Sequence, residues 1–133
     1  MLTLDRATYD AMVAHARRDH PDEACGLVAG KEGRPTRVLE MTNAARSPTF
    51  YEMDSTELLH ALRDLDDNDE DLLVIYHSHT ATEAYPSTTD IKLAGFPEAH
   101  YLLVSTRDPE TAEVRSFRIV DGVVTEEPLE VSG

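Results

Sequence analysis

An apolar run that leads directly into two histidines constrains this chain more than any other feature of the sequence. Residues 72–75 are typical of a buried strand, and His77 and His79 follow at positions i and i+2. Side chains two residues apart on a strand project from the same face. The two imidazoles are therefore expected to lie side by side, where they can bind one metal ion together.

A carboxylate follows the two histidines at the start of an expected helix. The loop breaks at Pro86, Ser87 stands at the N-cap position, and Asp90 falls in the first helical turn. Read alone, Ser87 and Asp90 predict no more than a capping box, and a histidine after a strand predicts no more than a polar strand end. Their conjunction with both histidines favours a metal site.

Two imidazoles and one carboxylate make three protein ligands, the number that a catalytic zinc ion keeps when its fourth position is left for water. We therefore predict a zinc site formed by His77, His79 and Asp90. A structural zinc ion would want a fourth protein ligand, most often cysteine, and Cys25 is the only cysteine in the chain.

Composition restricts the partners and the compartment. A chain of 133 residues is expected to form a single domain, residues 1–133. Its net charge of −14 disfavours nucleic acid and anionic membranes as partners. Neither a signal peptide nor an apolar run of about 20 residues is apparent, and a single cysteine excludes an internal disulfide. These features predict a cytoplasmic protein, and they leave a homo-oligomer open.

The rest of the chain predicts helices alternating with strands. The pattern indicates an amphipathic helix over residues 5–19, with Asp5 as its N-cap, and a second helix capped by Asp54 with Glu57 at the third helical position. The chain after residue 126 is expected to be a short polar tail. This order predicts an α/β fold in which a mixed sheet packs between helices. The expected strands are residues 24–29, 36–41, 72–75, 101–105, 114–120 and 123–126.

Several other side chains allow two interpretations. Glu23 alone is typical of an exposed loop acid, but beside a metal site it becomes a candidate general base. Cys25 would share its strand face and could approach the metal, although free cysteine is more often a small buried residue. Phe50 and Tyr51 could line a substrate groove or pack their loop on the core. The four remaining histidines show no ligand spacing and are expected at the surface or at strand edges: His15, His20, His60 and His100.

The pattern His77-x-His79-x7-Ser87-x2-Asp90 resembles the full motif of the JAMM (MPN+) zinc metallopeptidases, and Glu23 matches the upstream glutamate of that family. Over nearly its whole length the chain is similar to the bacterial Mec-type peptidases of the family, which act on the cysteine adduct of CysO, a ubiquitin-like sulfur-carrier protein. Residues 22–26, 47–51 and 76–90 carry the closer resemblance. It implies an α/β/α sandwich similar to the cytidine-deaminase-like arrangement.

The resemblance also implies roles and a reaction. One zinc ion per chain would be held by His77, His79 and Asp90. Glu23 would act as general base and then as general acid, and Ser87 would donate a hydrogen bond to the oxyanion. The implied reaction hydrolyses the bond between the C-terminal glycine of a CysO-type carrier protein and cysteine. Free cysteine would be released as a step of cysteine biosynthesis.

Three alternatives remain. The first is a zinc isopeptidase, similar to a deubiquitinase, that removes a ubiquitin-like modifier from lysines of target proteins. The second is a non-enzymatic scaffold like the metal-free MPN domains, which lose ligands that this chain retains. The third is a deaminase, but the P-C-x-x-C half of the deaminase signature is absent.

Overall fold

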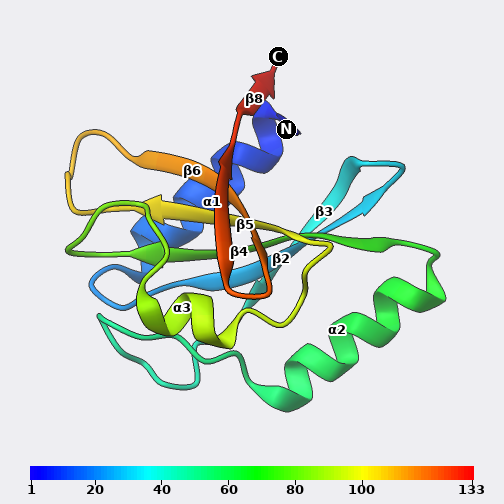
Figure 1. The fold of residues 1–133 in the computed structure, drawn as a ribbon, viewed down its shortest axis with the longest axis horizontal. Coiled ribbons are helices and arrows are strands. Elements are labelled where there is room, and N and C mark those ends of the chain that lie inside the picture. The colour runs from blue at the N-terminus through cyan, green and yellow to red at the C-terminus, as the bar shows by residue number, and fades with distance from the viewer.

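A computed structural model describes residues 1–133 and shows a six-stranded sheet with helices on both faces (Figure 1). A separate two-stranded sheet joins the two ends of the chain. In chain order the elements are β1 (Leu2–Asp5), α1 (Arg6–Asp19), β2 (Cys25–Lys31), β3 (Arg34–Met41), α2 (Ser55–Asp67), β4 (Asp71–His79), α3 (Thr88–Leu93), β5 (His100–Ser105), β6 (Glu113–Val120), β7 (Val123–Glu127) and β8 (Leu129–Ser132).

The large sheet is mixed. Its strand order is β3-β2-β4-β5-β6-β7, and β4 and β5 are parallel while every other neighbouring pair is antiparallel. β4 lies in the interior of the sheet, between β2 and β5. This confirms the α/β fold with a mixed central sheet.

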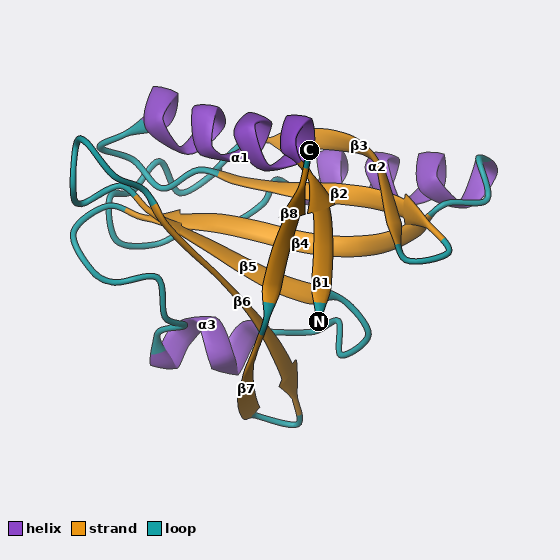
Figure 2. Cartoon of the chain, turned by 90° about the horizontal axis from the view of Figure 1, so that it is seen from above, coloured by secondary structure: helices purple, strands orange, loops and turns teal.

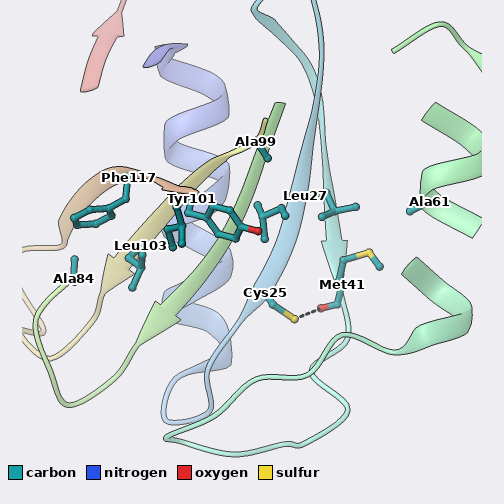
Figure 3. Close-up of a cluster of buried hydrophobic side chains, with 11 residues drawn as sticks. Cys25, Leu27, Met41, Ala61, Ala84, Ala99, Tyr101, Leu103 and Phe117 are labelled. Carbon is teal, nitrogen blue, oxygen red and sulfur yellow. Dashed lines mark hydrogen bonds between the residues drawn. The ribbon is translucent and has the colours of Figure 1, made fainter. Parts of the chain in front are cut away.

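Each face of the sheet has its own apolar cluster. On one face Met12 and Ala16 of α1 pack in a cluster with Val74 of β4. On the other face Ala61 of α2 belongs to a cluster with Ile75 of β4, and Ile91 of α3 packs against that cluster. Figure 3 shows the buried side chains of this second cluster. Figure 2 shows α1 and α3 on opposite sides of the sheet. β4 is therefore covered on both faces, which explains why its residues 72–75 form an uninterrupted apolar run.

The second helix begins as predicted. The Asp54 side chain accepts a hydrogen bond of 2.9 Å from the backbone N–H of Glu57 and caps α2. Asp5 precedes α1, also as predicted, but its side chain makes no capping hydrogen bond to the helix backbone. No helix combines the length and the apolar composition needed to cross a membrane.

The two ends of the chain differ from the prediction. β8, at Leu129–Ser132, is a strand and not a polar tail, and it pairs in parallel with β1, at Leu2–Asp5 (Figure 2). Alternation along β1 buries Leu2 and Leu4 in the α1-side cluster, against which Leu129 also packs. Four-residue strands are too short for a period-two pattern to stand out, so the sequence did not indicate this pairing.

His15 also departs from the prediction, because it is buried and not at the surface. Its Nδ1 lies 2.7 Å from the hydroxyl oxygen of Tyr76, and its Nε2 lies 3.1 Å from Asp19 Oδ2. Both ring nitrogens thus have partners, which removes the cost of burying them unpaired.

Gly26 is required where β2 passes Tyr76. A Cβ atom at Gly26 would lie 2.3 Å from the Tyr76 hydroxyl oxygen, and Tyr76 is fully buried. We expect Gly26→Ala to lower the free energy of unfolding by about 1–3 kcal/mol through overpacking, measured by urea denaturation. Gly95→Ala is the matched control, since its Cβ would come no closer than 3.9 Å to its nearest neighbour. Equal stability of both variants would contradict the expectation.

Candidate metal centre

The end of β4 and the start of α3 bring the predicted ligands together. His77 and His79 lie at the C-terminal end of β4 and are 2% and 6% exposed. Asp90 lies at the third position of α3, held by a capping box. In that box its backbone N–H donates to Ser87 Oγ over 3.0 Å, and the Ser87 backbone N–H donates to Asp90 Oδ2 over 2.8 Å. The predicted cap therefore fixes where the carboxylate points.

Asp90 Oδ2 lies 3.1 Å from His77 Nε2 and 3.0 Å from His79 Nε2. One ligand atom from each of the three residues falls within 4.8 Å of the others. His77 and Asp90 are close without hydrogen-bond geometry, and neither buried ring nitrogen of His77 has a hydrogen-bond partner. An unpaired buried nitrogen is costly, and a metal ion would satisfy it. The three side chains thus form a group that could bind a metal ion.

Neighbouring groups orient both imidazoles. His79 Nδ1 lies 2.9 Å from the carbonyl oxygen of Glu83, which can only accept, so Nδ1 carries the proton. In the neutral ring, the form that binds a metal ion, the lone pair of His79 is then on Nε2, the atom that faces Asp90. The His77 ring stacks on Tyr51, with centroids 4.3 Å apart and planes inclined by 23°. The rings are therefore fixed before any ion binds.

The pKa directions of two of these groups suit a metal site. Burial raises the pKa of Asp90, but its close contacts with His77 and His79 and the hydrogen bond from the Ser87 backbone outweigh it and hold that pKa well below its usual range. Burial lowers the pKa of His77, and its contact with Asp90 opposes this only in part. Asp90 is thus ionised and His77 neutral, which are the protonation states that metal ligation needs.

Glu23 lies just before β2 and is 5% exposed. Burial, reinforced by repulsion from Asp90 and opposed by His79, raises the pKa of Glu23 to about 7. The carboxyl group is therefore within electrostatic reach of two of the three predicted ligands. Its role as general base stays a prediction.

Ser87 is exposed, and its Oγ already accepts the capping hydrogen bond from Asp90. Its hydroxyl hydrogen is left free to donate. This arrangement is compatible with donation to an oxyanion, which stays a prediction.

An apolar groove begins beside Asp90. It encloses about 420 Å³ between the loop at residues 43–53, α2 and the segment that follows α3. Phe50 and Tyr51, which the sequence left unassigned, both line it. The remaining lining residues are mostly apolar: Leu27, Glu52, Met53, Leu58, Ile75, Leu93, Gly95, Phe96 and Tyr101.

Cys25 is fully buried and belongs to the apolar cluster on the α2 side of the sheet. Its sulfur points toward the Met41 carbonyl oxygen, 4.0 Å away (Figure 3). Burial raises the pKa of the thiol to about 12, so it stays protonated. These observations agree with a small core residue and give no support to a thiolate ligand.

We therefore expect Cys25→Ala to leave kcat/KM within about twofold of wild type. The free energy of unfolding should fall by about 1 kcal/mol because a small cavity forms. Steady-state kinetics and urea denaturation check the two parts. A tenfold loss of activity with unchanged metal content would show that Cys25 takes part in the reaction.

Known proteins resemble this chain over most of its length. Residues 5–120 match the family described as prokaryotic homologs of the JAB domain. The CysO-cysteine peptidase of Mycobacterium tuberculosis is 68% identical over 124 residues, which cover 92% of this chain and 85% of that protein. The probable TtuB-protein conjugate cleaving protease of Thermus thermophilus is 36% identical over 123 residues, covering 92% and 78%. A solution structure of a protein from Desulfitobacterium hafniense matches with a TM-score of 0.87 at 37% identity, covering 99% and 93%.

Proposed function

Because the chain belongs to the prokaryotic homologs of the JAB domain and is a peptidase, we propose that it acts as a single-domain, zinc-dependent peptidase on a ubiquitin-like sulfur carrier of the CysO type. The bond hydrolysed joins the C-terminal glycine of the carrier to cysteine. The observation that carries this proposal is a three-ligand group beside a buried carboxyl and at the end of an apolar groove. The similarity to the CysO-cysteine peptidase of Mycobacterium tuberculosis supports the choice of substrate.

His77, His79 and Asp90 would hold the zinc ion. Two imidazole nitrogens and one carboxylate oxygen are the donor set of a catalytic zinc site that keeps a position open. The bound ion supplies Lewis acidity, which polarises a carbonyl group and lowers the pKa of water. The unpaired nitrogens of His77 and the fixed tautomer of His79 favour these residues as the ligands.

Glu23 would accept the proton of the attacking water and deliver it to the leaving amine. A carboxyl group whose pKa lies near 7 can both take up and release a proton at neutral pH. Ser87 would donate its free hydroxyl hydrogen to the carbonyl oxygen as negative charge develops there. Such a donor contributes about 3 to 4 kcal/mol in the transition state.

The apolar groove would hold the carrier's tail. A flexible C-terminal segment laid between Phe50 and Phe96 would reach Asp90, which lines the same groove. Burial of its apolar atoms there would position the scissile bond before the reaction. We propose that the reaction takes place in the cytoplasm, where it releases free cysteine as a step of cysteine biosynthesis.

Intact mass spectrometry tests the proposal. A carrier protein bearing a C-terminal cysteine is incubated with wild-type protein, with and without a chelator. The carrier should lose one cysteine residue only when the protein is loaded with metal. An unchanged carrier mass with zinc-loaded protein would refute the proposed substrate.

A second candidate is a zinc isopeptidase that removes a ubiquitin-like modifier from lysines. The similarity to the conjugate-cleaving protease of Thermus thermophilus supports it. The same assay with a lysine-linked conjugate separates the two functions. Faster cleavage of the lysine-linked conjugate than of the cysteine adduct would favour this candidate.

A further inference from the structure

Asn43, at the start of the loop that joins β3 to α2, uses every hydrogen-bonding position of its side chain. Its Nδ2 donates to the carbonyl oxygens of Glu23 and Phe50, each over 3.0 Å. Its Oδ1 accepts from the backbone N–H groups of Ala45 and Glu52, each over 3.0 Å. An asparagine amide offers two donor hydrogens and two acceptor lone pairs, so this side chain is saturated.

Glu23 lies outside the hydrogen-bonded ladders of the sheet. The ladders that β2 forms with β3 and β4 both begin at Cys25, which pairs with Met41 and His77. The backbone of Glu23 is bonded instead to the loop at residues 43–53. Its N–H donates to the Ser47 carbonyl oxygen over 2.9 Å, and its carbonyl oxygen accepts from Asn43. Both backbone polar groups of the residue thus depend on this loop.

The same loop also reaches a predicted metal ligand and the groove. Tyr51 stacks on His77, and Phe50, whose carbonyl oxygen is bonded to Asn43, lines the groove. The Asn43 amide therefore joins three parts of the site: the peptide of Glu23, the wall of the groove and the segment that carries Tyr51.

We propose that Asn43 is a positioning residue that holds the Glu23 peptide in place and thereby aims the Glu23 carboxyl at the reacting bond. This inference rests on the proposed role of Glu23 as general base. A shift of about 1 Å in such a group costs about 100-fold in rate, so loosening this anchor should affect kcat strongly.

Two substitutions separate anchoring of Glu23 from folding of the loop. Asn43→Ala removes all four hydrogen bonds. Asn43→Asp keeps the oxygen that accepts from Ala45 and Glu52 but removes both donors, including the one to Glu23. The matched control is Asn68, the other asparagine of the chain, whose amide donates to the Asp64 carbonyl oxygen at the end of α2. Asn68→Asp and Asn68→Ala make the same chemical changes away from the site.

Hydrogen exchange of the metal-loaded protein tests the anchor without any substrate. The Glu23 N–H donates to Ser47 of the same loop, so its protection reports how firmly the Glu23 peptide stays on that loop. In both Asn43 variants this amide should exchange at least about tenfold faster than in wild type, because loss of the hydrogen bond from Asn43 lets the peptide move away from the loop. In Asn43→Asp the amides of Ala45 and Glu52 should stay protected. Neither Asn68 variant should change exchange at Glu23. An unchanged Glu23 amide in Asn43→Ala would overturn the proposal.

A double-mutant cycle tests whether Asn43 acts through Glu23. In the wild-type background both Asn43 variants should keep their zinc and lose about 100-fold in kcat. In the Glu23→Gln background the same substitutions should change the residual rate less than about twofold, because the group they misplace is already inactive. Equal losses in both backgrounds would show a general structural effect and would overturn the proposal.

The exchange experiment and the kinetic experiment also separate this inference from the proposed function. A wild-type protein that cleaves neither a cysteine adduct nor a lysine conjugate would refute the proposed function. Exchange at the Glu23 amide would still decide whether Asn43 anchors that residue.

Discussion

Asp90→Ala should leave the protein without zinc and without peptidase activity. The substitution removes one of three predicted ligands and the only carboxylate among them. It also removes the oxygen that His77 and His79 both face. Loss of a group that only supports a metal ligand weakens metal binding by about 10 to 100-fold, so loss of a ligand itself should exceed about 100-fold. Metal analysis after gel filtration in dilute chelator measures the effect.

The Asp90 side chain also caps α3, and this second role needs a control. Asp54→Ala likewise removes a carboxylate that caps a helix, here the N-cap side chain of α2, which accepts from the Glu57 backbone over 2.9 Å. It should lower the free energy of unfolding by about 1 kcal/mol and leave zinc content and turnover unchanged. Asp90→Asn tests the ligand role with the cap retained. Its amide oxygen can still accept from the Ser87 backbone, but it carries no charge to bind the metal ion. Wild-type zinc content in both Asp90 variants would show that the ligand set is wrong.

The parts of this site that the sequence predicted are those encoded within a few residues. His77 and His79 share a strand face because side chains alternate with a period of two. Asp90 is placed by a capping box that spans only three residues beyond Ser87. Both features can be recognised without knowing how the rest of the chain folds, and the structure places these residues together.

The parts that the sequence did not predict join residues distant in the chain. Tyr51 stacks on His77, which lies 26 residues later, and Asn43 holds the peptide of Glu23, which lies 20 residues earlier. No periodicity signals either contact, because each depends on how a loop folds back over the sheet edge. His15 and Tyr76 also form a buried hydrogen bond between distant parts of the chain, here because α1 packs on the face of the sheet. A histidine on a helix gives no local sign that its partner lies on a strand.

Glu23→Gln should retain zinc and lose about 100 to 10,000-fold in kcat, the contribution expected of a positioned general base. Glutamine keeps the size and the polarity of the side chain but cannot take up a proton. Asp22→Asn is the matched control, since it removes the neighbouring carboxylate and should keep turnover within about twofold of wild type. Steady-state kinetics on the cysteine adduct and metal analysis of the same samples measure both effects. Turnover above a tenth of wild type would remove Glu23 from the role of base.

The same variant should change how the stability of the metal-free protein depends on pH. The pKa of Glu23 lies at about 7 in the folded protein against an ordinary value of 4.5, with burial as the main cause. Between these two values the folded state binds the proton that the unfolded state has released, so this residue makes stability fall as pH rises. Glutamine cannot ionise, so Glu23→Gln should match wild type near pH 4.5 and exceed its free energy of unfolding above pH 7. Parallel pH profiles of wild type and variant would show that the Glu23 carboxyl is not desolvated and that its pKa is not raised. Glu23 would then lack the raised pKa that suits it to return a proton to the leaving amine.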